Sequence, residues 1–252
     1  MPALSAQDIL RIWEAGTGQE PVRRALTILA AASPAIPRDE LAGLTVGRRD
    51  AQLLALLEET FGSKLESVAA CAHCGESMEF VLHADELRAQ LAPVDTDDGR
   101  EVFAPVEGAV RVGGWSLRYR LPTSGDLIAA AASRDPDEAR RVLNARCILE
   151  ARRAGAVAAV EDVPPEAASR MADAMVEQDP MADVLVDFAC QACGERGETI
   201  FDVAAYLWAE IRAQALRLLQ EVDVLARAYG WREVDILALS AIRRHAYLDL
   251  VT

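Results

Sequence analysis

Apolar residues recur at steps of three and four along most of the chain, which predicts a mainly helical fold. The longest run begins after Asp202, a helix-capping residue, and continues to Tyr229, where Gly230 ends it. Shorter runs of the same period predict further helices at about residues 6–15, 20–32, 38–44, 48–61, 84–91, 123–132, 135–154, 164–177 and 234–248.

Three stretches alternate apolar and polar residues instead, which predicts strands. Residues 109–112 and 115–121 flank Gly113-Gly114 and predict a β-hairpin, with Trp115 and Tyr119 on its apolar face. The other two stretches surround residues 71–74 and 190–193, with Phe80 and Phe188 among their apolar positions. Residues 95–99 predict an acidic loop. The helical spacing and the strand alternation together predict an α+β fold that is mainly helical.

Two short turns carry the candidate chemistry. Each holds two cysteines three positions apart, followed at once by glycine and glutamate. Two such thiolates can face one metal ion, and a glycine lets the backbone turn around the sulfurs. Four sulfurs complete a closed tetrahedral zinc shell, so we predict one structural Zn²⁺ ion shared by both turns. The predicted ligands are Cys71, Cys74, Cys190 and Cys193.

The repeated strand, turn and strand pattern suggests a pseudo-twofold arrangement around the metal, and it divides the chain into four regions. Residues 1–64 form an N-terminal helical region, and residues 203–252 form a C-terminal helical hairpin. Residues 65–92 and 183–202 together form a split, zinc-ribbon-like core made of two zinc-knuckle hairpins. Residues 93–182 are an insert that contains the glycine hairpin and several helices.

Charge and cysteine usage narrow the function. The formal net charge of −14 disfavours nucleic acid as a partner, because phosphate binding needs concentrated positive charge. No apolar run is long enough to span a membrane, and the first residues lack the pattern of a secretion signal. Paired cysteines of this kind suit metal binding in a reducing cytoplasm, where we expect the protein to lie. Cys147 is expected to be a small buried residue.

No residue pattern indicates catalysis. A redox dithiol is the rival use of a Cys-x-x-Cys turn, but such a site normally precedes a helix, and here glycine and an extended segment follow. Ser124 lacks the flanking glycines of a nucleophile elbow, and helix capping by Thr123 and Asp126 explains its surroundings. We therefore predict a protein that is not an enzyme, with no catalytic residue and no cofactor other than zinc.

Several segments, in this order along the chain, look like parts of one family: residues 44–51, 61–75, 120–127, 190–194 and 229–248. Their sequences include Leu-Thr-Val-Gly-Arg-Arg-Asp-Ala, Arg-Leu-Pro-Thr-Ser-Gly-Asp-Leu and Tyr-Gly-Trp-Arg-Glu, together with both Cys-x-x-Cys-Gly turns. This order resembles the baseplate hub assembly chaperone family of T-even-like phages, whose relatives occur with contractile phage tails and phage-tail-like injection particles. The first 40 residues lie outside the resemblance.

The resemblance implies an assembly chaperone or structural protein of a baseplate hub, with hub or spike proteins as partners and no catalytic residues. Its expected location is the bacterial cytoplasm or an assembled tail-like particle. The alternative from a different class is a zinc-ribbon regulator that binds nucleic acid, which the acidic composition disfavours.

Overall fold

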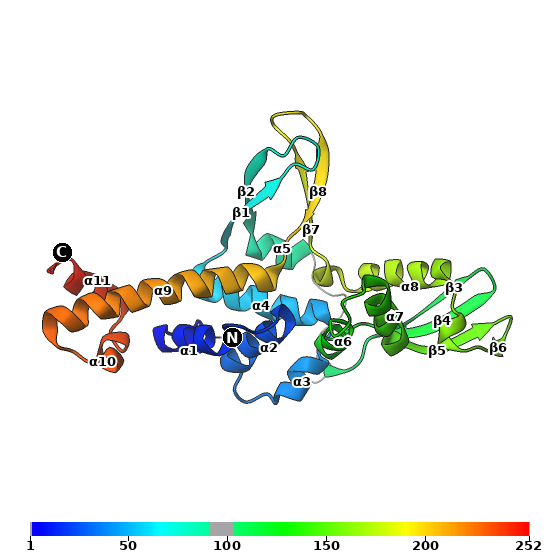
Figure 1. The fold of residues 1–252 in the computed structure, drawn as a ribbon, viewed down its shortest axis with the longest axis horizontal. Coiled ribbons are helices and arrows are strands. Elements are labelled where there is room, and N and C mark those ends of the chain that lie inside the picture. Colours follow the sequence, from blue (N-terminus) through cyan, green and yellow to red (C-terminus); the bar gives the residue numbers. More distant parts are fainter. Residues whose placement is uncertain (1, 91–102, 252) are drawn as a thin grey trace.

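The structure is a computed structural model and describes residues 2–90 and 103–251 of the chain. It has three parts, which can be followed in Figure 1. A helical body occupies the middle, two β-hairpins stand up from it, and the insert extends to one end. The predicted α+β fold is confirmed. The predicted loop at residues 95–99 lies outside the described residues.

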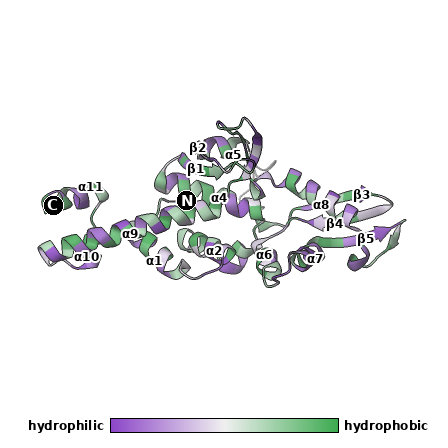
Figure 2. Cartoon of the chain, turned by 45° about the horizontal axis from the view of Figure 1, so that its top comes forward, coloured by the Kyte–Doolittle hydropathy of each residue, from purple (hydrophilic) through white to green (hydrophobic). Residues whose placement is uncertain are grey.

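The helical body buries the apolar faces that the sequence predicts. The long helix α9 places Leu207, Ile211 and Ala215 in the same core as Leu53 and Leu57 of α4. In Figure 2, hydrophobic positions recur along α4 and α9 between hydrophilic ones, as amphipathic helices require. The helices of the body are α1 (Ala6–Gly16), α2 (Pro21–Ala32), α3 (Arg38–Gly43), α4 (Val46–Phe61) and α9 (Val203–Tyr229).

Local capping explains where these helices begin and end. The Ser5 side chain accepts a hydrogen bond from the backbone of Asp8, and the Asp8 side chain accepts one from the backbone of Ser5. Asp202 caps the start of α9 by accepting from Ala205 N. Gly230 ends α9 with a left-handed backbone at φ 67°, a conformation that glycine adopts without a steric penalty.

The two hairpins that stand up from the body are called the cysteine arm here. In each hairpin one face is half-buried or buried and the other is exposed, as alternation predicts. Figure 1 shows the two hairpins side by side. The strands are β1 (Lys64–Ala70) with β2 (Ser77–His83), and β7 (Leu185–Ala189) with β8 (Arg196–Ile200).

The insert is a four-stranded antiparallel sheet, in the order β3-β4-β5-β6, with helix α8 (Pro165–Gln178) against one face. Trp115, Leu117 and Tyr119 of β4 point to the α8 side and are buried there with Met171. The predicted hairpin is therefore confirmed as β3 (Glu107–Val112) and β4 (Trp115–Arg120). The other strands are β5 (Ile148–Arg153) and β6 (Ala156–Val157), and short 3-10 turns lie at Val160–Asp162 and Pro180–Ala182.

The prediction of one helix over residues 135–154 is wrong in its second half. Helix α7 (Pro136–Cys147) ends before Ile148, and the chain continues as β5 paired with β4. The segment is rich in alanine and arginine and has good intrinsic helix propensity, but burial of Ile148 and Ala151 against the sheet decides its conformation. Ala154 at φ 50° and Gly155 at φ 87° then form the turn to β6.

The C-terminal helical hairpin also differs in detail from the prediction. The last predicted helix is two short helices, α10 (Glu233–Leu237) and α11 (Ala241–Leu248). Ser240 separates them, because its side chain accepts from Arg243 N and begins a new helix there. Helix α5 (Ala84–Gln90) and helix α6 (Ser124–Ala130) lie where they are predicted.

The insert joins the body where the N-terminal ends of two helices meet. Thr45 and Thr123, which cap α4 and α6, form an isolated β-bridge, and Val46 N donates to the carbonyl of Pro122 at 3.1 Å. These contacts place the N-terminal ends of both helices against each other. In the part of the chain that the structure describes, no helix has the length and apolarity needed to cross a membrane.

Candidate metal centre

The first cysteine turn is a tight knuckle closed by backbone hydrogen bonds. Gly75 N donates to the carbonyl of Cys71, and Cys71 N donates to the carbonyl of Glu76, each at 2.8 Å. Gly75 has φ 77°, a positive value that glycine adopts without a steric penalty and that lets the backbone turn around the sulfurs. The antiparallel strands β1 and β2 carry this turn at their far end.

The second turn repeats this geometry. Gly194 N donates to the carbonyl of Cys190, and Cys190 N to the carbonyl of Glu195, again each at 2.8 Å, and Gly194 has φ 76°. The correspondence continues at the same spacing of 119 positions into the helices, because α5 begins at Ala84 and α9 at Val203. The duplicated unit is therefore strand, knuckle, strand and helix start, and it is longer than the turn alone.

The structure brings all four predicted ligand residues together. Their Sγ atoms all lie within 4.8 Å of one another. The Sγ atom of Cys71 is 3.8 Å from that of Cys193, and the Sγ atom of Cys74 is 3.6 Å from that of Cys190. Four sulfurs bound to one zinc ion at about 2.3 Å lie about 3.8 Å apart, so the separations suit a tetrahedral site made of four cysteines.

The two short sulfur separations show the pseudo-twofold arrangement that the sequence suggests. Exchanging the two knuckles exchanges Cys71 with Cys190 and Cys74 with Cys193. This exchange turns the 3.8 Å contact into the 3.6 Å contact. Cys71 and Cys190 are buried, whereas Cys74 and Cys193 are exposed, so burial follows the same symmetry.

Backbone N–H groups favour the anionic form of these sulfurs. Those of Cys193 and Ala192 point at the Cys190 thiol and lower its pKa to about 7. Glu195 N–H acts on Cys193 in the same direction, but partial desolvation of the sulfur by its surroundings and the three neighbouring thiols outweigh it and raise the pKa of Cys193 to about 12. Four thiols this close cannot all ionise without a cation among them, so the cluster can hold one metal ion.

Zinc fits this donor set best, because soft thiolates in a tetrahedron are its structural ligands. Four protein sulfurs leave no open position for water or substrate, so a bound zinc ion would cross-link the two hairpins. His73 is an exposed spacer inside the first knuckle and does not belong to the four-residue cluster. Four thiolates and one divalent ion would add two negative charges to the chain's −14.

Other sequence candidates are built into the fold. Ser124 is fully buried at the start of α6, and within the described residues its Oγ has no hydrogen-bond partner. Cys147 is buried, and this burial raises the pKa of its thiol to about 11, as suits an inert packing residue. Both residues therefore lie in the interior of the fold.

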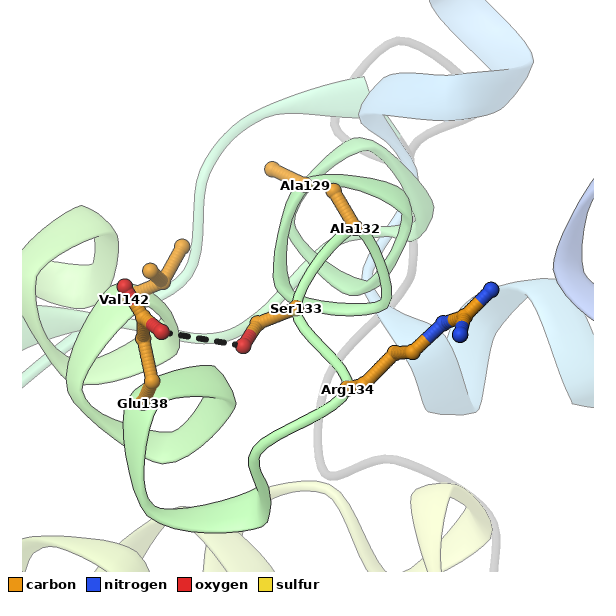
Figure 3. Close-up of a pocket in the computed structure, with 6 residues that line it drawn as sticks. All are labelled: Ala129, Ala132, Ser133, Arg134, Glu138 and Val142. Atoms are coloured by element: carbon orange, nitrogen blue, oxygen red, sulfur yellow. Dashed lines mark hydrogen bonds between the residues drawn. The ribbon is translucent and has the colours of Figure 1, made fainter.

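An open pocket between α6 and α7 is lined by Ala129, Ala132, Ser133, Arg134, Glu138 and Val142. Figure 3 shows Ser133 hydrogen-bonded to Glu138, at 3.2 Å, while Arg134 points away from both. The polar groups therefore do not converge on a common point, and the hollow has no arrangement suited to catalysis or tight binding.

A buried ionic cluster was not predicted by the sequence. Asp126 accepts hydrogen bonds from Arg120 at 2.6 and 2.9 Å and from Arg146 at 2.8 Å. Burial by itself raises the pKa of Asp126, but hydrogen bonds from Arg120, Thr123 and Arg146 hold it well below its ordinary value. The capping pattern identified Asp126, but its arginine partners come from β4 and α7 and have no local signal.

Comparison with protein-family models, with curated proteins and with solved structures gave no match for this chain. The assignment of the site therefore depends on its own geometry. That geometry defines a four-cysteine centre, of the kind that holds structural zinc, on a pair of hairpins.

Proposed function

We propose that this chain is a non-enzymatic, zinc-stabilised assembly chaperone or structural protein of a contractile, phage-tail-like baseplate hub. Its partners would be hub or spike proteins, met in the bacterial cytoplasm or in the assembled particle. One observation carries the proposal. Each of the five segments that resemble the baseplate hub chaperone family makes a contact that holds parts of the chain together.

Three such contacts support a scaffold. The segment at residues 44–51 and the segment at residues 120–127 meet through the bridge between Thr45 and Thr123. The two cysteine turns meet at the metal centre. In the segment at residues 229–248, the ring of Tyr229 at the end of α9 packs edge-on against the ring of Tyr247 in α11, with centroids 5.7 Å apart. Each of these contacts joins secondary-structure elements, which is what a rigid binding platform requires.

The proposal is tested by mixing the zinc-loaded chain with purified hub and spike proteins of a tail-like particle from the same host. We expect a complex that elutes together on size exclusion and survives at physiological salt. An unrelated acidic protein of similar size is the control, because it shows how much binding to the hub and spike proteins arises from net charge alone. Absence of a complex with every hub and spike component would refute the baseplate assignment.

One observation favours the alternative, a nucleic-acid-binding regulator. The face of the insert sheet that points away from α8 carries Arg111, Arg118 and Arg152. Arg118 and Arg152 are both paired with Glu150, however, and the cysteine arm itself is rich in glutamate. A mobility-shift assay at low salt distinguishes the two functions: binding that weakens steeply with added salt would replace the scaffold proposal.

A further inference from the structure

The C-terminal tip, defined here as residues 216–251, exposes an unusual share of apolar side chains. Of the fourteen large apolar residues that are exposed in the described part of the chain, seven lie in this tip. The tip is about one seventh of the chain, so the enrichment is more than threefold. Exposed apolar residues gathered in one region mark interaction sites more often than scattered ones do.

Helix α11 buries an arginine and exposes an isoleucine, which is unusual for a surface helix. Arg244 is only 4% exposed, whereas Ile242 is 84% exposed and Leu250, in the turn after the helix, is 75% exposed. Ile242 and Ala246 are exposed and one helical turn apart, so they lie on the same side of α11, and exposed Leu250 follows four positions later in the turn after the helix. These three residues are called the apolar stripe here. A surface helix normally turns its polar side outward.

The anchored side of α11 fixes this orientation. Arg244 Nε donates to Glu221 Oε2 of α9 at 2.7 Å, and Arg244 Nη1 donates to the carbonyl of Leu239 at 2.8 Å. The Tyr247 ring packs edge-on against Trp231, with centroids 4.9 Å apart. Turning the apolar stripe inward would break these contacts and would leave the Glu221 carboxylate without its cation.

We propose that this stripe is a self-association site, on which α11 of a second copy of the chain packs with the two Ala246 residues at the crossing point. The stripe is large, small and large in order, symmetric about Ala246. It is therefore complementary to itself under a twofold axis, as an isologous interface requires. This inference does not depend on the baseplate assignment.

Charge favours a second copy at this place. Residues 216–251 contain five arginines and five acidic residues, so their formal charge is zero and the remaining residues carry the whole −14. Two copies therefore repel each other over most of their surface but not at the tip. Figure 1 shows the tip at one end of the longest axis, where another molecule can approach without meeting the body.

The size of the stripe sets the expected strength. A pair of short helices buries less than the about 1,200 Å² of a standard stable interface, so the dimer should be weak and concentration-dependent. We expect the zinc-loaded full chain to change from monomer to dimer in sedimentation equilibrium between about 5 and about 500 µM.

Ile242→Asp and Leu250→Asp should each weaken this association about tenfold or more, because each places a charge in an apolar seam. Val157→Asp is the matched control, since Val157 is also 75% exposed but lies in the insert, and it should dimerise like wild type. Unchanged zinc content and Trp fluorescence would show that the variants are folded.

A cross-linking experiment tests the crossing point directly. Ala246→Cys should give a disulfide-linked dimer under mild oxidation of the zinc-loaded protein, whereas Val157→Cys should give no more than wild type. A chain that stays monomeric at the highest concentration overturns the proposal and leaves the stripe to a different protein. Dimerisation that neither aspartate variant weakens, or the absence of the Ala246→Cys cross-link, overturns it as well.

Discussion

The carboxylate of Asp179 accepts a 3.0 Å hydrogen bond from the backbone N–H of Gly47, which lies 132 positions earlier in the chain. Gly47 belongs to the first turn of α4, and Asp179 lies between α8 and the 3-10 turn at Pro180–Ala182. The anion therefore lies at the positive end of the α4 dipole and joins the body to the end of the insert.

Gly47→Ala should destabilise the protein by about 2–3 kcal/mol, because a new Cβ would lie 1.8 Å from Asp179 Oδ1. Urea denaturation measures this change. Gly43→Ala is the control: Gly43 lies in helix α3, and a Cβ there meets nothing within 4 Å, so its midpoint should stay the same or rise slightly. Equal midpoints for the two variants would show that Asp179 does not pack against Gly47 in solution.

Elemental analysis should find about one zinc per chain, as four ligands from two hairpins require. Cys193→Ser should lose the metal and lower the melting temperature by on the order of 10 °C, since metal binding is coupled to folding of the cysteine arm. Cys147→Ala should keep the full zinc content, because Cys147 is not part of the cluster. Unchanged thermal stability after chelation would argue against a structural role for the metal.

The Asp126 cluster predicts a defined pH dependence. The folded pKa of Asp126 lies below its ordinary value of 3.8, so its contribution to stability is present above about pH 4 and is lost as the pH falls further. Asp126→Asn should cost about 3 kcal/mol at pH 7, because it leaves Arg120 partly buried without its carboxylate.

The difference in unfolding free energy between wild type and Asp126→Asn should shrink as the pH falls below 4. Loss of metal at low pH lowers the unfolding free energy of both proteins alike, so it cancels in this difference. Arg146→Gln should cost only about 1 kcal/mol, because the Arg146 side chain is 46% exposed. A gap between wild type and Asp126→Asn that stays constant from pH 7 to 3 would contradict the assigned cause.

Arg244→Gln should loosen α11 without unfolding the body, because it removes the buried ion pair with Glu221. Hydrogen exchange at residues 241–248 should become at least about tenfold faster, while exchange in α4 stays the same. Arg227→Gln removes an exposed pair with Asp223 and serves as the control, with no change expected in α11. Equal protection of α11 in both variants would mean that other contacts anchor this helix.

The features that the sequence predicted well are those with a local cause. Both knuckles are specified by cysteine spacing and a following glycine, and both flanking strands alternate in the usual way. The helix starts at Ser5, Thr123 and Asp202 follow from capping residues. The convergence of the four thiols was inferred from the repeat, and the geometry agrees with it. Metal binding itself stays a prediction.

The features that were missed depend on distant contacts. Residues 148–153 have helix-forming composition, and only pairing with β4 makes them a strand. The turn at Ala154 and Gly155 lacks the usual asparagine or aspartate signal. The contact between Gly47 and Asp179 and the arginine partners of Asp126 join separate elements, so no window of sequence could indicate them.

The order of the ligands along the chain has a consequence for synthesis. A growing chain exposes Cys71 and Cys74 long before it reaches Cys190 and Cys193, and the whole insert is made in between. A zinc ion held by all four thiolates could be enclosed only once the second knuckle has left the ribosome, so the first knuckle would offer two thiolates while the insert is made. Zinc capture would then report that the insert has been made and has brought its two ends together.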